Sequence, residues 1–281
     1  MKMTPATTPD SVVEWRRSNW TTFGYCLIVS LGAILFGLDT ATISGVIMIN
    51  KFQEDFGDMG PITGAFSISA GGQTLLYGLL LNGAILASMV SGPIETRYGR
   101  RAGLYCCAGT SLLGPAVQVV SPNIGIHAFE RVITGAGIGF AANFCGTYWS
   151  EICMARHRGH VIMMYQGFIN AAAFAGAGII QGVHNLNNKW AWRTPLVVMM
   201  SAPLLMLLLI PLLPETPRWY VTRGRYQEAR ESLGKVRGTT WPPAELDREI
   251  DDITAMFELE RSLEGSRARG LDNIPRLLPQ N

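Results

Sequence analysis

The sequence predicts an all-α membrane protein with six transmembrane helices, followed by short helices in an aqueous compartment. Charged residues make up only 16% of the 281 residues and hydrophobic residues 48%, whereas an average soluble domain is about 25% charged. Six apolar stretches follow one another, each about the 20 residues needed to cross a hydrocarbon core of about 30 Å. Beyond Pro214 the chain becomes charge-rich, which marks the boundary between a lipid-embedded and an aqueous region.

These patterns divide the chain into four parts. We expect an N-terminal tail over residues 1–22, a transmembrane bundle over 23–213, a helical segment over 214–264 and an unstructured tail over 265–281. The six spans are predicted at 23–46, 74–94, 102–120, 124–148, 161–183 and 194–213. In the fourth span, Gly135, Gly137 and Gly139 predict a tight helix-packing face, because small residues let membrane helices approach closely.

Two amphipathic helices are expected after the last span. Apolar residues share one face of each helix, and Pro242 and Pro243 are typical of the start of the second. The first face consists of Tyr226, Ala229, Leu233 and Val236, and the second of Leu246, Ile250, Ile253 and Phe257.

The loops between the spans predict the orientation. Positive residues concentrate before the first span, in the second and fourth connections and after the sixth span, and the remaining connections are poor in them. The positive segments contain Arg16, Arg17, Arg97, Arg100, Arg101, Arg156, Arg158, Arg218, Arg223 and Arg225. Because positive residues mark the cytoplasmic side, both termini are predicted to be cytoplasmic.

Two ionisable residues lie well inside apolar stretches. Asp39 is about seven residues before the outer end of the first span, and Arg131 is about seven residues after the outer start of the fourth. At 1.5 Å per residue both lie roughly 10 Å below the outer surface, so they could pair across the bundle interior. An unpaired charge at that depth is costly. A substrate or proton site is therefore the functional interpretation, and a structural ion pair is the alternative. The neighbouring Glu130 points about 100° away around the helix and is expected to serve another neighbour.

Two amides lie four residues apart on the fifth span. Gln166 and Asn170 therefore share one face. An amide offers both donors and an acceptor, which suits a hydroxyl-rich ligand, although the pair could equally bond neighbouring helices. Trp190 and Trp192 lie at the outer boundary, where interfacial aromatics are common.

Several function classes are disfavoured. The net charge of +2 and the lack of a basic run interleaved with aromatics argue against a nucleic-acid partner. The five cysteines have no metal-ligand spacing, and no nucleophile–base constellation is visible. We therefore expect no enzyme activity and no cofactor.

Five segments carry a resemblance to a known family, and each lies at a span edge. They begin at Gly37-Leu-Asp-Thr40, Gly92-Pro-Ile-Glu-Thr-Arg-Tyr-Gly-Arg-Arg101, Arg131-Val-Ile-Thr-Gly-Ala-Gly-Ile-Gly139, Tyr148-Trp-Ser-Glu and Pro214-Glu-Thr-Pro-Arg-Trp219. Their order and content resemble the N-terminal half of sugar porters of the major facilitator superfamily, with fungal members most similar. The resemblance covers about residues 20–260 and implies a six-helix half with a 3+3 inverted repeat.

The resemblance also implies roles for particular residues. Asp39 matches the acidic residue that proton-coupled members use, with Arg131 as its partner. Gln166 matches a sugar-binding glutamine, with Asn170 beside it. The cytoplasmic latch of the outward-facing state matches five residues, namely Arg97, Arg101, Glu151, Glu215 and Arg218. Three positions depart from the family pattern, which has Asp at Thr96, Pro at Met154 and a second binding glutamine at Ala173.

Length is the largest departure, because the family has twelve spans in two halves around a central site. The implied function is carbohydrate transport, by sugar–proton symport, in a chain truncated to its N-terminal half and expected to be inactive alone. The expected partners are sugar, proton, the lipid bilayer and a separate C-terminal half, and the expected location is the plasma membrane. Two alternatives stay open, a non-transporting membrane sensor or partner protein, and a transporter of another small hydroxylated solute such as a cyclic acid.

Overall fold

The structure is a computed structural model that describes residues 20–59, 66–153, 158–186, 188–238 and 241–273. Contacts divide the chain into two compact units, one of residues 22–215 and one of residues 216–281 together with 1–21. Most of the predicted tail 1–22, the end of the predicted tail 265–281 and Met154 lie outside the described residues.

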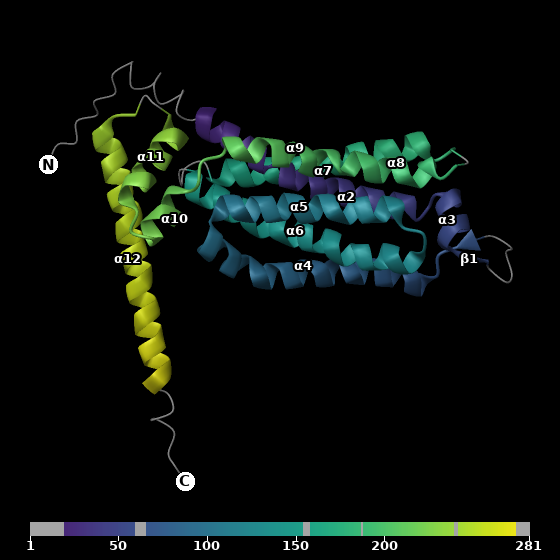
Figure 1. Cartoon of the computed structure of the whole chain (residues 1–281), viewed down its shortest axis with the longest axis horizontal. Helices are drawn as coiled ribbons and strands as arrows, with labels where there is room; N and C mark the ends of the chain where they lie inside the picture. Colours follow the sequence, from purple (N-terminus) through teal and green to yellow (C-terminus); the bar gives the residue numbers. More distant parts are fainter. Residues whose placement is uncertain (1–19, 60–65, 154–157, 187, 239–240, 274–281) are drawn as a thin grey trace, which may run out of the picture. The chain divides into compact units, whose positions relative to one another are not determined.

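The first unit is a bundle of six long helical stretches that run alongside one another (Figure 1). All six predicted spans are helical, and most of these helices extend a few residues beyond the predicted ends. The stretches are Trp20–Val46, which includes α2 (Leu31–Val46), then α4 (Ala70–Tyr98), α5 (Arg100–Val120), α6 (Ile124–Ile152), α7 (Arg158–Val183), and Trp190–Leu212, which consists of α8 (Trp190–Met199), α9 (Ser201–Leu209) and the 3-10 turn η2 (Ile210–Leu212).

Five of these stretches, all except α6, are both long and apolar enough to cross a membrane among the described residues. The exception has 29 residues and the required length, but it carries buried polar side chains such as Glu130, Arg131 and Thr134. Helix α6 packs against α4 and α5 along its length and also contacts α2 and α7. A helix enclosed by protein on several sides can hold polar groups that a lipid-facing helix cannot.

The pairing of the spans repeats internally. The first span packs on the fifth (α2 on α7) as the fourth packs on the second (α6 on α4). The contact between the third and fourth spans (α5 and α6) corresponds to that between the sixth and first spans (α8 and α9 with α2). The contact between the second and third spans (α4 and α5) corresponds to that between the fifth and sixth spans (α7 and α8). These three kinds of contact are reproduced when spans one, two and three exchange with spans four, five and six. This is the pattern expected of a 3+3 repeat.

Small residues allow these close approaches. A Cβ atom added to Gly135 would overlap the carbonyl oxygen of Leu80 on α4, and one added to Gly37 would overlap that of Ile169 on α7. A Cβ at Gly137 would instead meet the Ser111 side chain on α5. The predicted tight packing face of the fourth span is therefore confirmed, and it serves two neighbours rather than one.

The connection between the first two spans holds a small structure that the sequence patterns did not reveal. It consists of α3 (Asn50–Phe56) and the antiparallel pair β1 (Asp58–Met59) and β2 (Phe66–Ser67). The ring of Phe52 lies 5.2 Å from that of His127 and 5.9 Å from that of Trp192, between ring centroids. These rings, with Phe56, form an aromatic cluster at the α3 end of the bundle. Trp192 is therefore a core residue, and not the interfacial anchor that was expected.

The second unit contains α10 (Pro217–Thr222), α11 (Tyr226–Arg237) and α12 (Pro243–Asn273). Both predicted amphipathic faces are confirmed for the main part, since Ala229 and Leu233 pack with Val221 and Ile250 in one apolar cluster. Helix α12 begins at Pro243 as predicted but continues to Asn273, so the helical segment does not end at residue 264. Glycine lowers helix propensity by about 1 kcal/mol without forbidding a helix, and Gly265 and Gly270 are separated by strong helix formers.

Candidate functional site

Arg131 is the centre of a buried polar group between three helices. We call Asp39, Gln118, His127, Glu130, Arg131 and Thr134 the guanidinium cluster. Helix α6 carries Arg131 toward α2, where its Nη1 donates to the Asp39 Oδ1 at 3.0 Å. Both side chains are at most 2% exposed. The pairing predicted from their matched depth is confirmed.

Glu130 belongs to the same cluster, contrary to expectation. Arg131 Nε donates to the Glu130 Oε2 at 3.3 Å, and the Thr134 hydroxyl donates to the other Glu130 oxygen. The argument from a 100° separation was wrong because it considers only the direction of the Cα–Cβ bonds. A guanidinium at the end of a long side chain can turn back beside its own helix, and here it lies between the acid from its own helix and the acid from α2.

Two further groups extend the cluster toward the aromatic rings. Arg131 Nη2 donates to the Gln118 Oε1 at 3.0 Å, and the Gln118 Nε2 lies 2.7 Å from the His127 Nε2. Arginine can only donate, so the Gln118 oxygen is the acceptor and its NH₂ group faces the imidazole. His127 must therefore accept at Nε2 and carry its hydrogen on Nδ1, which makes it the neutral imidazole.

Burial decides what this arrangement costs. Every member of the guanidinium cluster is buried. Charges taken out of water are tolerated only when they are paired and hydrogen-bonded, and removing one partner of a buried pair costs about 3–5 kcal/mol. Asp39 Oδ2 and His127 Nδ1 have no protein partner within the described part of the chain. The hydrogen-bonding capacity of this cluster is therefore not fully used by the described residues.

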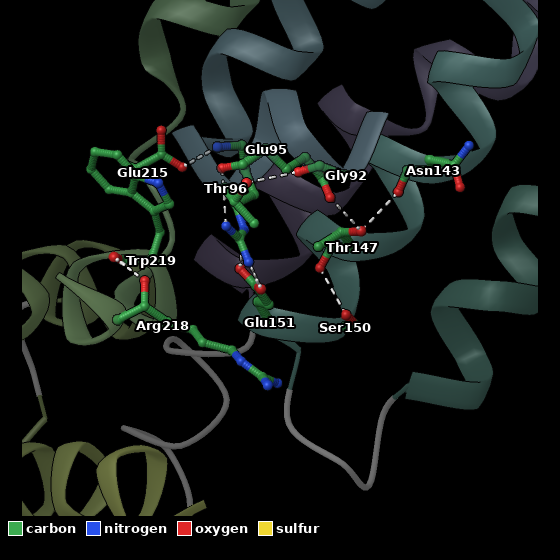
Figure 2. Close-up of polar contacts among 12 residues, drawn as sticks. Gly92, Glu95, Thr96, Asn143, Thr147, Ser150, Glu151, Glu215, Arg218 and Trp219 are labelled. Carbon is green, nitrogen blue, oxygen red and sulfur yellow. Dashed lines mark hydrogen bonds and ion pairs between the residues drawn. The ribbon is translucent and has the colours of Figure 1, made fainter. Parts of the chain in front are cut away.

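A second polar group lies at the end of the bundle where α4 ends and α5 begins. We call Glu95, Arg100, Thr147, Glu151 and Glu215 the helix-end cluster. Arg100 donates to both oxygens of Glu151, from Nε at 2.9 Å and from Nη2 at 2.5 Å. Thr147 donates to a Glu95 oxygen at 3.3 Å, a contact drawn beside Glu151 and Glu215 in Figure 2.

Gly99 gives the helix-end cluster its geometry. Its φ of 96° and ψ of 171° lie in a region that essentially only glycine adopts, and the chain turns there from α4 directly into α5. The first backbone N–H groups of α5 are thereby free to bind an anion. Arg100 N donates to the Glu215 carboxylate at 2.8 Å and Arg101 N at 3.2 Å, which is the favourable place for a negative charge.

The structure brings together only part of the predicted latch. Glu151 and Glu215 lie in the helix-end cluster, but the arginine side chain that binds Glu151 belongs to Arg100 and not to Arg101, which contributes its backbone N–H. Arg97 is exposed, with its guanidinium carbon 5.5 Å from the Tyr98 ring centroid. Arg218 belongs to the second unit, where it pairs with Glu260.

The two amides named from the sequence are exposed on α7. Gln166 and Asn170 lie on one face of this helix, and Ala172 and Gly176 on its other face pack toward α2. The exposed face continues with Phe174, which is 84% exposed. Gln166 and Asn170 are therefore available to a ligand, and they are separate from the buried guanidinium cluster.

Six polar members of the two clusters were not named as site residues from the sequence, namely Gln118, His127, Thr134, Glu95, Arg100 and Thr147. Arg100 had a signal, since it was noted as a charge in the second connection beside Arg101. Gln118 and His127 had none, because one polar residue near a span end is equally compatible with the membrane interface. In the described part of the chain, no group of three or more His, Cys, Asp or Glu residues could hold a metal ion.

Comparisons with known proteins agree on one family. The family model described as sugar (and other) transporter matches residues 25–273. The hexose transporter HXT10 of Saccharomyces cerevisiae is 32% identical over 267 residues, covering 94% of this chain and 49% of that protein. The galactose-proton symporter of Escherichia coli K12 is 27% identical, covering 90% of this chain and 51% of that protein. The chain thus spans about half the length of these curated relatives.

A solved structure shares the fold. The structure of the proton:xylose symporter XylE bound to 6-bromo-6-deoxy-D-glucose superposes with a TM-score of 0.75 at 23% identity, covering 89% of this chain and 56% of that one.

Proposed function

We propose a function from one premise, that this chain belongs to the sugar (and other) transporter family and is a multi-pass membrane protein. We infer that it forms the N-terminal half of a sugar transporter and that transport is coupled to protons. The observation that carries this proposal is the ion pair of Asp39 and Arg131, 3.0 Å apart and closed off from solvent. A titratable pair inside a membrane bundle is by default a functional site.

The buried ion pair and the two exposed amides each have a role in this proposal. Asp39 takes up and releases the proton, and Arg131 is its partner. Gln166 and Asn170, exposed on α7, bind sugar hydroxyls. In transporters built from two halves, the substrate site lies between them near the midplane. These amides would form one wall of such a site. The chain acts as a carrier and has no catalytic role.

The helix-end cluster holds one conformation of the transporter. Glu151 and Glu215 each bind the start of α5, through the Arg100 side chain and through backbone N–H groups. Their release together would favour a second conformation, since breaking several contacts at once can shift a two-state equilibrium. From the positive residues in the connections, we infer that this cluster and both termini lie on the cytoplasmic side. The plasma membrane is the proposed location.

Sugar binding to the purified 281-residue chain in lipid nanodiscs tests the proposal. Hexose should quench or shift intrinsic tryptophan fluorescence in a saturable way, and Gln166→Ala should weaken binding about tenfold or more. That loss corresponds to the about 1.4 kcal/mol of one or two hydrogen bonds. Gln181→Ala is the matched control, because Gln181 is an exposed amide farther along the same helix. Equal effects of the two substitutions would contradict the assignment of Gln166.

A second candidate substrate is a small hydroxylated acid. Ala173 stands seven residues after Gln166, where the family pattern has a second sugar-binding glutamine, so the amide set for a hexose is incomplete. Competition in the same binding experiment distinguishes the two classes. Displacement by cyclic hydroxy acids and not by hexoses would favour the acid. Binding of neither, together with capture of a full-length transporter, would favour a non-transporting partner protein.

A further inference from the structure

The guanidinium cluster contains one acid more than it has bases. Arg131 is the only arginine or lysine in contact with Asp39 and Glu130 among the described residues, and both carboxyl groups are shielded from water. If both were ionised, the cluster would carry a net negative charge in a low-dielectric interior. Two acids that share one counter-ion normally retain one proton between them.

His127 cannot balance the second acid. Its Nε2 faces the NH₂ group of Gln118 at 2.7 Å, because the Gln118 oxygen is occupied by Arg131. A protonated imidazole would direct an N–H group at another donor, so His127 is neutral in this arrangement.

Among the described residues of the surrounding elements, no other charged side chain forms an ion pair with Asp39, Glu130 or Arg131. Helix α4 carries its described charges, Glu95 and Arg97, at its far end, as α5 does with Arg100 and Arg101. In α8, the guanidinium carbon of Arg193 lies 5.0 Å from the Trp192 ring centroid. In α3, Asp55 accepts from Trp192 Nε1 at 3.2 Å and pairs with Lys51.

The distances favour one of the two acids as the proton carrier. Arg131 approaches the Asp39 oxygen at 3.0 Å, but its contacts with Glu130 are longer, at 3.3 Å from Nε and 3.5 Å from Nη2. The shorter guanidinium contact favours the ionised form of Asp39. The hydroxyl of Thr134 also donates to Glu130, and the carbonyl oxygen of a neutral carboxyl group can accept that hydrogen bond. We propose that Glu130 is a second protonation site of the transporter, neutral while Asp39 is ionised and paired with Arg131.

The consequence is an exchange of partners. When the shared proton moves from Glu130 to Asp39, Glu130 becomes the ionised partner of Arg131. The cluster keeps one proton and one ion pair throughout, and Arg131 is never left alone in the bundle. This inference extends the proposed proton coupling. Its chemical claim, one proton shared by two acids, does not require any sugar.

Thermal stability of the whole chain in nanodiscs at pH 7 tests the exchange. Glu130→Gln mimics the neutral acid and should change the apparent Tm by about 2 °C or less. Asp39→Asn forces Glu130 to replace Asp39 through poorer contacts and should lower the Tm by roughly 5 °C. The double variant leaves Arg131 with no carboxylate. Its Tm should fall by about 10 °C or more, well beyond the sum of the two single-variant shifts.

Glu151→Gln is a matched control outside the cluster. Glu151 receives both hydrogen bonds of Arg100, so this substitution alone should lower the Tm. A loss for Glu130→Gln as large as for Asp39→Asn, with an additive double variant, would overturn the proposal, because it would mean that both acids are ionised. A neutral Asp39→Asn beside a costly Glu130→Gln would also overturn it, because the proton would then reside on Asp39.

Infrared difference spectroscopy supplies an independent readout. The spectrum of the unmodified chain minus that of Glu130→Gln should contain the carbonyl stretch of a protonated carboxylic acid at pH 7. The absence of that band would refute a neutral Glu130. Neither measurement uses sugar, so a result that refutes this inference would not bear on the proposed sugar binding. A failure to bind sugar would, conversely, leave the assignment of the proton standing.

Discussion

The two polar clusters of the bundle differ in their burial and in the groups that pair with their charges. The guanidinium cluster lies between helices, has no contact with water, and satisfies one guanidinium with two acids and an amide. The helix-end cluster lies where helices begin and end, is partly exposed, and uses backbone N–H groups as well as side chains. A charge that is lost from the first leaves its partner in a dry interior, whereas one lost from the second can be replaced by water. We therefore expect the same kind of substitution to have unequal effects in the two places.

The largest effect is expected for Arg131→Met. The substitution retains the apolar stem of the side chain but removes the cation that faces Asp39 and Glu130. The expected loss in the free energy of unfolding is about 3–5 kcal/mol. Thermal melts in detergent micelles followed by size-exclusion chromatography measure it. A variant as stable as the unmodified chain would mean that the buried pair contributes nothing to the fold.

Arg100→Met makes the equivalent change in the helix-end cluster. Two charge-assisted hydrogen bonds to Glu151 are lost, and Glu151 is near enough to the bundle end to be rehydrated. The same melts should show a smaller loss of about 1.5–3 kcal/mol. Arg97→Met, at an exposed neighbour on α4, is the control and should stay within about 0.5 kcal/mol. If Arg100→Met cost as much as Arg131→Met, the contrast between the clusters would be lost.

Gly99→Ala tests whether backbone geometry maintains the helix-end cluster. At a φ of 96°, a side chain is strained by about 1–3 kcal/mol, and relief of that strain would move the Arg100 and Arg101 N–H groups away from Glu215. Gly92→Ala on α4 is the matched control, since an added Cβ there would meet no atom within 4 Å. Comparable melting curves for the two variants would show that the turn tolerates other conformations.

The smallest effect is expected in the second unit, at the exposed pair of Arg225 and Glu228. Hydrogen bonding from Arg225 holds the pKa of Glu228 below its ordinary value of 4.5. A lowered pKa in the folded state contributes stability above the unfolded pKa, and this contribution disappears as the pH falls through the folded value. The protection factors of the amide hydrogens at the start of α11 should therefore fall slightly more, below about pH 4, in the unmodified chain than in Glu228→Gln. An identical pH dependence would show that the pair contributes nothing.

The fold was predictable to a large extent because a bilayer imposes its own length scale. Six apolar stretches of about 20 residues predicted six helices, and each appears within a few residues of its expected ends. The fourth span was the least apolar, and its polar residues are buried against neighbouring helices. The α3 helix and the β1–β2 pair were missed, because elements of seven and two residues leave little periodicity to read.

In the candidate site, only the contact that depends on the depth of the residues in the membrane could be predicted from the sequence. Asp39 and Arg131 meet because residues at equal depth on neighbouring helices can meet. Glu130 was assigned to another neighbour because helical angles ignore the reach of a long side chain. Arg101 was preferred to Arg100 because the choice between adjacent arginines depends on where α5 starts, and the torsion angles of Gly99 set that point.

The aromatic cluster of Phe52, Phe56 and Trp192 has a consequence for timing. These rings pack around His127, between the guanidinium cluster and the connection that contains α3. Phe52 and Phe56 both pack edge to face on Trp192, so under the proposed coupling a proton that enters from that side would have to pass these packed rings. The rate of proton exchange between Asp39 and the medium would then be limited by the side-chain motion of a phenylalanine, and would depend little on the pH of the medium.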